Sequence, residues 1–232
     1  DENRLLELRY DGELNNDWQP SFRVYSGSYR FGGNWHYSTS SDTRDRASAS
    51  WAGSEFHMAY TGFAQHKLIF GIDAQWNKRL DQQYYDIDPR NSVLDISKKT
   101  HTTGLFVQDE WRFHPELLLN IGLRHDKHSD FQAITSPRTA LIWQATPRFS
   151  LKAIISKAYR TPNANERFYS DAISQESNPE LKPEHIKSSE LAGAYRFSQN
   201  GRIGLSIYNN RMNNLIDQAT APSGLAKYMN QS

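Results

Sequence analysis

Apolar and polar residues alternate along most of this sequence, and this period of two limits the possible fold more than any other feature. Successive side chains of a β-strand point to opposite faces of its sheet, so the alternation predicts strands that bury one face only. The pattern is clear in residues 67–76, 117–126 and 149–160. In the first of these segments, the residues of one face are Leu68, Phe70, Ile72, Ala74 and Trp76. The chain is therefore predicted to be all-β.

The connections between these segments alternate in length. Short turns are predicted at 114–116 and 146–148, whereas polar stretches without any period occupy 77–99, 127–136 and 159–184. Up-and-down barrels have this arrangement, because one rim carries tight turns and the other carries longer binding loops. We predict an antiparallel up-and-down transmembrane β-barrel, here a partial barrel of about 10–12 strands with long extracellular loops.

Local signals in the first third of the chain lead to three further expectations. The pair Gly32-Gly33 is expected to end a strand, because glycine pairs commonly mark turns and loops. Residues 34–46 are rich in Ser, Thr and Asp and are expected to form a loop. Residues 47–63 are expected to form a hairpin that turns at Gly53-Ser54.

The composition is poor in residues for a soluble core. The hydrophobic fraction is 37% and the mean hydropathy is −0.78, whereas soluble domains are roughly 45–50% apolar. Disordered chains and transmembrane barrels both tolerate such a composition, but 6 Trp, 12 Tyr and 11 Phe are typical of a folded chain. The net charge of +1 comes from mixed signs and indicates no nucleic-acid surface. The absence of cysteine excludes disulfides and thiolate sites within this chain.

The polar segment 159–184 contains two short motifs. It begins with Tyr159-Arg160-Thr161-Pro162 and Glu166, and it ends with Asn178-Pro179-Glu180-Leu181-Lys182-Pro183-Glu184. These motifs resemble the paired Phe-Arg-Ala-Pro and Asn-Pro-Asn-Leu boxes of TonB-dependent outer-membrane receptors of the siderophore-receptor type. Further pieces match the same family in the same order, at 106–111, 122–126, 136–138 and 228–230. The resemblance extends from about residue 104 to the end. The earlier residues resemble the family only in the spacing of their predicted strands.

The resemblance implies a fold, a location and a set of partners. Receptors of this family close with about 22 strands around a plug, so residues 1–232 are expected to be one domain, a partial barrel without the plug and the final strands. The family lies in the bacterial outer membrane, where the TonB energy-coupling complex pulls on the plug and drives uptake of a scarce nutrient, most often a ferric siderophore. The expected partners are that complex, a small-molecule metal chelate and outer-membrane lipid, without nucleic acid. No resident cofactor is expected, since the iron complex would be the cargo.

Three other functions remain open from the sequence. The first is a haem or cobalamin receptor of the same family. Haem receptors often place a histidine ligand between the two motifs, but residues 163–177 contain none and His185 follows the second motif. The second is a passive outer-membrane pore or adhesin barrel, and the third is a soluble β-sheet binding module.

Two sets of residues are candidates for binding. The motif set is predicted either to hold the loop or to line a ligand rim, and the structural role is favoured because both motifs recur in receptors with different cargo. Its members are Arg160, Pro162, Asn163, Glu166, Asn178, Pro179, Leu181, Pro183 and Glu184. The aromatic set is predicted to lie in loops and to stack on a planar or catecholate ligand, or simply to pack those loops. Its members are Tyr84, Tyr85, Phe168 and Tyr169.

Neither a catalytic site nor a metal site is predicted. The sequence has no Gly-x-Ser-x-Gly elbow for a serine nucleophile. Asp109 and Glu110 are adjacent on a predicted strand, so their carboxylates face opposite ways and cannot flank one bond. His125 and His128 would also face opposite ways, which disfavours joint ligation of a metal. The chain is therefore not predicted to be an enzyme.

Overall fold

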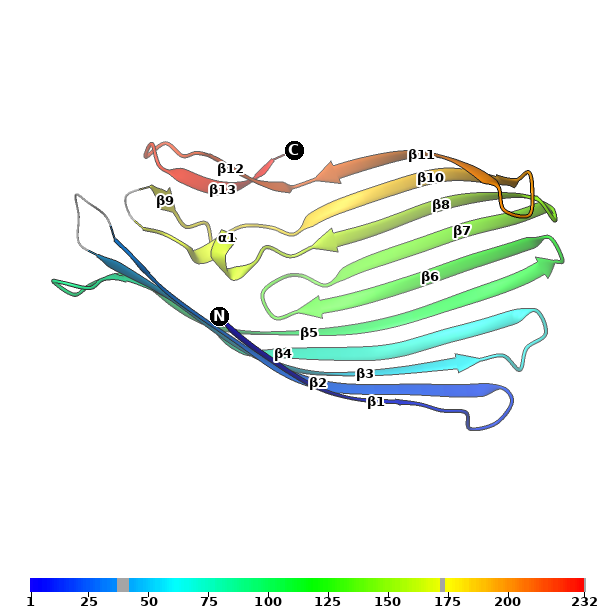
Figure 1. Ribbon diagram of the computed structural model, residues 1–232, viewed down its shortest axis with the longest axis horizontal. Coiled ribbons are helices and arrows are strands. Elements are labelled where there is room, and N and C mark those ends of the chain that lie inside the picture. The colour runs from blue at the N-terminus through cyan, green and yellow to red at the C-terminus, as the bar shows by residue number, and fades with distance from the viewer. Residues whose placement is uncertain (37–41, 172–173, 232) are drawn as a thin grey trace.

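The computed structural model describes residues 1–36, 42–171 and 174–231, and ten strands of this part of the chain form one antiparallel sheet (Figure 1). The order in the sheet is β1-β2-β3-β4-β5-β6-β7-β8-β10-β11. Their bounds are β1 Glu2–Asp11, β2 Trp18–Trp35, β3 Thr43–Tyr60, β4 His66–Asp86, β5 Asn91–His114, β6 Leu117–His128, β7 Ile134–Thr146, β8 Phe149–Arg160, β10 Glu184–Arg196 and β11 Arg202–Asn213. Strands that follow one another along the wall are joined up and down, as predicted.

The remaining elements gather at one end of this wall. They are α1 Ala164–Phe168, β9 Gln175–Glu176, β12 Leu215–Thr220 and β13 Ala226–Gln231, and the three strands form a second sheet in the order β12-β13-β9. Figure 1 shows them on the left of the view, at the same end as the extended tips of β2 to β5. We call this end the motif rim, because the 161–183 connection lies there. The opposite end is the turn rim, where β5 and β6 and then β7 and β8 are joined by two residues each, 115–116 and 147–148.

The wall has one apolar face and one polar face. Phe22, Phe56, Ile72 and Leu105 are successive cross-strand neighbours on β2 to β5, and all four side chains are exposed. On the other face, Arg23, Glu55 and Asp73 are successive cross-strand neighbours. An exposed apolar band of this kind is costly in water and is typical of the lipid-facing surface of a barrel, whose interior is polar.

The buried apolar residues lie mainly at the motif rim. Among the described residues they are Leu94, Ile96, Ala140, Leu181, Ile216 and Ala221. Of these six, Ala140 belongs to the central part of the wall, whereas the others belong to the tip of the β4–β5 hairpin, the 161–183 segment or the β12–β13 hairpin. The small cores of this molecule therefore stabilise the structures that project from the wall.

The hairpin predicted for residues 47–63 was wrong, because β3 runs without interruption through Gly53. Tyr25 lies opposite Gly53, and Trp51 lies opposite Gly27. A Cβ at Gly53 would lie 2.4 Å from the Tyr25 ring, and a Cβ at Gly27 would lie 2.3 Å from the Trp51 ring. These glycines make room for cross-strand aromatic rings and do not form a turn.

Three predictions, one of a strand end and two of loops, were also wrong. β2 continues through Gly32-Gly33 to Trp35 and β3 begins at Thr43, so the loop predicted for 34–46 is shorter; residues 37–41 of it lie outside the described residues. The loop predicted for 77–99 is the extended part of a hairpin, since β4 and β5 pair as far as Asp86 and Asn91 around the turn 87–90. The apolar pattern in this extension is short: Leu94 and Ile96 are buried and alternate with Asp95 and Ser97, and the rest is mostly polar.

Candidate functional site

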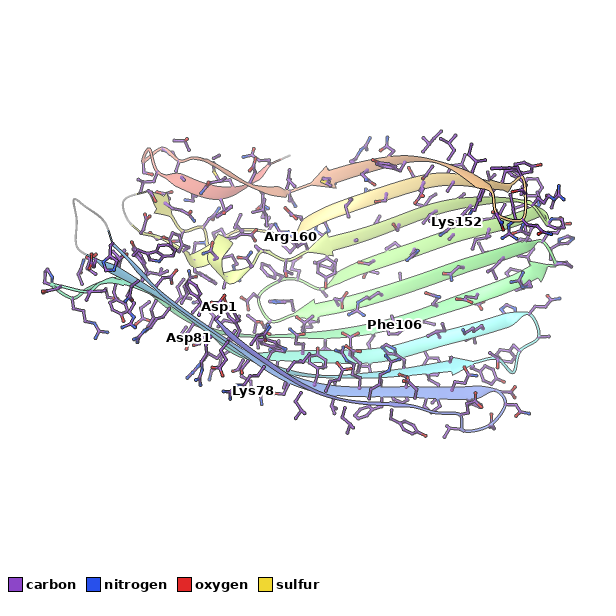
Figure 2. The ribbon with its side chains drawn as sticks, viewed as in Figure 1. Asp1, Lys78, Asp81, Phe106, Lys152 and Arg160 are labelled. Carbon is purple, nitrogen blue, oxygen red and sulfur yellow. The ribbon has the colours of Figure 1, made fainter. Side chains whose placement is uncertain are left out.

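Arg160, the last residue of β8, joins the two strands that flank the 161–183 segment. It lies opposite Glu184, the first residue of β10. Its Nε donates to Glu184 Oε2 at 2.6 Å, and its Nη1 donates to both Glu166 oxygens at 3.0 Å. The two carboxylates are mostly buried, at 14% and 18% side-chain exposure, whereas Arg160 is 45% exposed. One guanidinium therefore binds two carboxylates at the motif rim, where Figure 2 labels Arg160.

The short helix α1 begins with a capping box that fixes Glu166. The Asn163 side chain accepts from the Glu166 backbone N at 2.9 Å, and Glu166 Oε2 accepts from the Asn163 backbone N at 2.8 Å. This reciprocal pair satisfies two N–H groups that a helix start leaves without partners. Pro162 precedes the cap and has no N–H to donate, which is compatible with the end of β8 at Arg160. The first motif thus ends a strand, starts a helix and positions an acid beside Arg160.

The second motif fastens the same segment to the β12–β13 hairpin. Asn178 Nδ2 donates to the Tyr228 carbonyl at 2.8 Å, and the Asn178 backbone N donates to the Arg167 carbonyl at 2.9 Å. The Leu181 side chain is only 2% exposed. Residues 178–184 are therefore packed against a hairpin whose contacting residues follow 32 to 50 positions later in the chain.

Two further contacts connect the second motif to β12 and β13. Asn230 exchanges hydrogen bonds with the Lys182 backbone, accepting from its N at 2.8 Å and donating to its carbonyl at 2.9 Å. Glu184 Oε1 accepts from the Ile216 backbone N at 2.7 Å, while its other oxygen is bound by Arg160. Nearby, the Lys227 ammonium, together with the Ser223 hydroxyl, lowers the pKa of the Glu176 carboxyl.

Arg167 of α1 connects the 161–183 segment to the β6–β7 loop. Its Nη1 donates to Asp130 Oδ2 at 2.6 Å, and its guanidinium lies over the rings of Phe131 and Phe168 at 4.9 and 4.7 Å. Burial raises the pKa of the Asp130 carboxyl, but hydrogen bonds from Ser129 and Arg167 outweigh burial and hold it below its usual range. Sequence reasoning missed Arg167, although it stands one residue after Glu166.

The aromatic set is distributed over two structures. Tyr84 and Tyr85 lie in β4, so the prediction that they are loop residues was wrong; the reason is the extension of the β4–β5 hairpin. Two guanidinium groups lie near the Tyr85 ring, those of Arg46 at 5.9 Å and Arg90 at 4.9 Å from its centroid. Phe168 ends α1, where the Lys98 ammonium lies 4.5 Å from its ring, and Tyr169 forms the C-cap of that helix.

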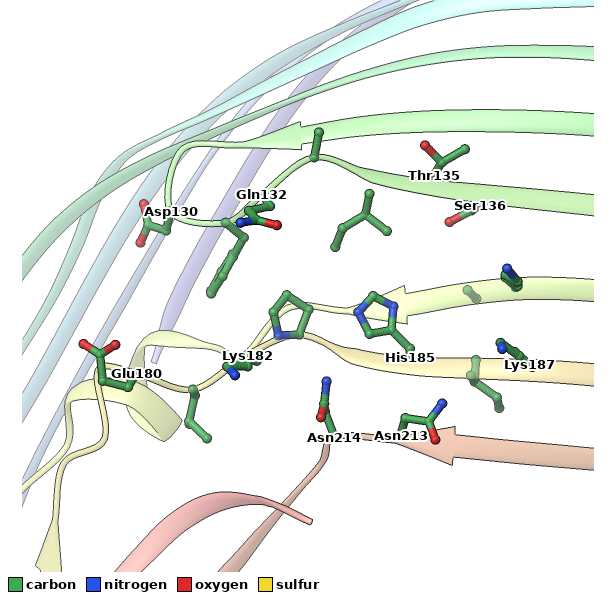
Figure 3. Close-up of a pocket in the computed structure, with 18 of the residues that line it drawn as sticks. Asp130, Gln132, Thr135, Ser136, Glu180, Lys182, His185, Lys187, Asn213 and Asn214 are labelled. Carbon is green, nitrogen blue, oxygen red and sulfur yellow. The ribbon is translucent and has the colours of Figure 1, made fainter. Parts of the chain in front are cut away.

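A cavity of about 1070 Å³ lies where β7 separates from β8 at the motif rim (Figure 3). The pairing of β7 with β8 begins only at Arg138 and Ser156, so the strand ends beyond that point leave room between them. Cationic, anionic and amide side chains all line the cavity. They include Asp130, Gln132, Lys157, Arg167, Glu180, Lys182, His185, Lys187 and Asn213. The motif residues Pro179, Leu181 and Pro183 form part of the same lining.

The polar face carries a charge network that sequence reasoning did not single out. Arg124 binds Asp73 through two hydrogen bonds of 2.8 and 2.9 Å, and it binds Asp126 through two more of 2.9 and 2.6 Å. Arg23 pairs in the same manner with Glu7 at 2.7 Å and Glu55 at 2.8 Å. Charged residues at every second position of neighbouring strands were the available signal. Such bridges are typical of a wall that faces a wet lumen.

The family model described as "TonB dependent receptor-like, beta-barrel" matches residues 1–231. The chain belongs to the TonB-dependent receptor family. As a member of this family it is an outer-membrane protein, and the family consists of transport receptors and not enzymes.

Relatives and solved structures agree with this membership. The iron-regulated outer membrane virulence protein of Vibrio cholerae is 25% identical over 166 residues, which cover 69% of this chain and 25% of that protein. The vitamin B12 transporter BtuB of Vibrio cholerae is 26% identical over 181 residues, covering 78% of this chain and 26% of the transporter. The chain thus spans about a quarter of the length of the curated relatives it matches.

Two solved structures share the fold. The copper transporter OprC superposes with a TM-score of 0.80 at 15% identity, covering 98% of this chain and 41% of that one. The ferric enterobactin receptor PfeA of Pseudomonas aeruginosa superposes with a TM-score of 0.74 at 19% identity, covering 98% and 39%. These likenesses confirm the predicted fold, a partial wall of a TonB-dependent receptor barrel.

In this TonB-dependent receptor chain, the motif set forms one connected structure and the aromatic set does not. Arg160, Glu166 and Glu184 form a charge cluster, while Asn163 and Asn178 hold backbone groups. These contacts are of the kind that the structural role requires, and whether the same residues touch a ligand stays a prediction. Among the described residues, no group of three or more His, Asp or Glu side chains is placed to hold a metal ion. In that same part of the chain, no helix is long and apolar enough to cross a membrane.

Proposed function

We propose that this chain is part of the barrel wall and external rim of a receptor that takes up a scarce nutrient by TonB-dependent, energy-coupled transport, foremost a ferric siderophore. The observation that carries the proposal is the motif rim. There, the 161–183 segment, the β6–β7 loop and the β12–β13 hairpin are bound together beside a cavity of about 1070 Å³. Ordered external loops around a cavity are suited to capture of a small molecule.

The chemistry of this rim supports an anionic, aromatic cargo. Lys98, Arg167 and Lys182 bring cationic groups to the rim, and the rings of Phe131 and Phe168 lie beside them. Ferric siderophores with catecholate groups combine negative charge with flat rings, which such a surface would attract and stack. Two similar proteins support the same class of cargo. One relative is an iron-regulated outer membrane protein, and one structural neighbour is a ferric enterobactin receptor.

In this proposal, residues 1–232 form one domain, and the plug and the remaining strands belong to the rest of the receptor. The TonB energy-coupling complex would act on the plug segment, and the wall would contribute the passage and the capture rim. The charged polar face, with Arg23 and Arg124 bridging carboxylates, is suited to line that passage. Cobalamin is the second candidate cargo, because the vitamin B12 transporter matches 78% of this chain.

Uptake by cells tests this proposal. Cells with and without the full gene are given labelled ferric siderophores, haem and cobalamin, with the proton gradient intact or collapsed. We expect the gene to confer uptake of one class, foremost a ferric siderophore, and we expect collapse of the gradient to abolish that uptake. Uptake that persists without a gradient would contradict energy coupling and favour a passive pore. Gradient-dependent uptake of cobalamin or haem alone would retain the receptor and overturn the siderophore assignment.

A further inference from the structure

Basic side chains follow one another down the polar face of β7, β8, β10 and β11. Arg138 lies opposite Gly122, two positions from Arg124 on β6, so Arg138 shares the polar face with Arg124. The register of the following strands places the others on the same face. Successive levels are separated by four residues, about 13 Å along a strand. In order from the motif rim to the turn rim, these side chains are Arg138, Lys152, which Figure 2 labels, and the directly opposed pair Arg196 and Arg202.

This half of the polar face carries an excess of positive charge. None of the ion pairs among the described residues contains Arg138, Lys152, Arg196 or Arg202. Like charges on directly opposed residues destabilise a sheet. Between the two rims, the carboxylate on this face of the four strands is that of Glu190, which accepts from the Ser206 hydroxyl at 2.7 Å. On β1 to β6, by contrast, both arginine networks are bound by two acids each.

Each level of positive charge borders a cavity. Arg138 lines one of about 680 Å³, Lys152 and Arg202 line a second of about 360 Å³, and Arg196 and Arg202 line a third of about 160 Å³ nearest the turn rim. The first cavity shares lining residues with the cavity at the motif rim. Small side chains leave space around the long basic ones in the second cavity, at Ser150, Ala192, Ala194, Gly204 and Ser206.

We propose that Arg138, Lys152, Arg196 and Arg202 form a cationic track that holds an anionic cargo in successive steps on its way from the motif rim to the turn rim. Fixed charges of one sign in a narrow passage raise the local concentration of the opposite ion. Several weak sites in series let a bound ion advance without being trapped at one of them. The track rests on the proposed function, since it requires an imported cargo, and it adds that the cargo is an anion that moves along the β7 to β11 side of the lumen.

Uptake by cells that express the full-length receptor tests the track, with a labelled, negatively charged ferric tris-catecholate chelate as the probe. The test variant is Lys152→Gln, Arg196→Gln and Arg202→Gln, all distant from the motif rim. Its surface binding in the cold should equal that of the wild type, whereas its gradient-dependent uptake rate should fall at least about fivefold. Lys152→Arg, Arg196→Lys and Arg202→Lys keep the charges and should restore most of the uptake.

The matched control removes the same number of exposed cations from β2, β4 and β5, none of them in an ion pair of the described residues. It is Arg30→Gln, Lys67→Gln and Arg112→Gln, and its uptake is expected to stay at the wild-type rate. If the test variant does not assemble, the single Arg202→Gln variant is measured in the same way, with an expected loss of about twofold.

Three results would overturn the track while the proposed function stands. They are uptake by the test variant at the wild-type rate, an equal loss in the control, and a loss that the charge-retaining variant does not restore. Increased entry of a large antibiotic such as vancomycin through the test variant would also overturn the track, because the cations would then hold the plug in place. A wild-type receptor that neither binds nor imports the chelate would overturn the siderophore assignment and the track together.

Discussion

Replacing Arg160 with methionine is expected to release the 161–183 segment from the wall. The variant keeps an unbranched apolar stem of similar length but leaves Glu166 and Glu184 without their shared cation. Because both carboxylates are mostly buried while Arg160 is partly exposed, we expect the segment to lose about 2 kcal/mol, between the cost of breaking an exposed pair and a buried one. In the full-length receptor, amide hydrogen exchange of residues 163–184 would then speed up by roughly 30-fold.

Two further variants separate the charge network from a general effect of losing an arginine. Arg160→Lys keeps the charge but cannot bind two carboxylates with a planar fork, so an intermediate increase in exchange is expected. Arg148→Met removes an exposed arginine in the β7–β8 turn at the opposite rim and should leave exchange in 163–184 unchanged. Protection in Arg160→Met equal to that of the wild type would show that the motif does not hold the segment.

A charge on the apolar face of the wall is expected to prevent or weaken insertion. Val107 of β5 lies between Phe70 and Leu123 on neighbouring strands, and it is 50% exposed in the isolated chain. Arginine on the lipid face near the middle of a bilayer costs about 2–4 kcal/mol in a transmembrane barrel. The Val107→Arg variant of the full-length receptor should therefore unfold at markedly lower urea concentration in lipid vesicles and should yield less folded, heat-modifiable protein in cells.

Gln108→Arg is the matched control, because the neighbouring residue points to the polar face. Gln108 Nε2 donates to Glu110 Oε1 at 3.3 Å, so an arginine there would meet a carboxylate and water in place of lipid. Its stability is expected to stay close to that of the wild type. If Gln108→Arg were the damaging substitution and Val107→Arg the tolerated one, the assignment of the two faces would be reversed.

The sequence was sufficient to predict the wall wherever a strand has one dry face and one wet face. Residues 67–76, 117–126 and 149–160 all lie in strands of the sheet, β4, β6 and β8, because lipid on one side and water on the other impose the period of two. The prediction failed where that contrast is absent. In residues 77–86 and 91–99 the buried residues Leu94 and Ile96 alternate with polar ones over only a short run. Gly53 was mistaken for a turn because the ring that it accommodates, that of Tyr25, lies on another strand.

The candidate site could be predicted only in part for a similar reason. Arg160, Glu166 and Glu184 stand out in the sequence because prolines and asparagines surround them, and the structure brings the three together. The contacts that fasten the rest of the segment could not be found by reading it, since the partner of Arg167, Asp130, lies in an earlier loop, and the partner of Lys182, Asn230, lies in the last strand.

The proposed function requires the motif rim to face outward from the cell, and cysteine labelling measures this orientation directly. The chain has no cysteine of its own. Arg90→Cys places a thiol in the β4–β5 turn at the motif rim, and Asn200→Cys places one in the 197–201 turn at the turn rim. In a full-length receptor without other cysteines, a membrane-impermeant maleimide should label the Arg90→Cys variant on intact cells, and the Asn200→Cys variant only after the outer membrane is permeabilised. Labelling of Asn200→Cys but not Arg90→Cys on intact cells would contradict this orientation, and with it the capture of cargo at the motif rim.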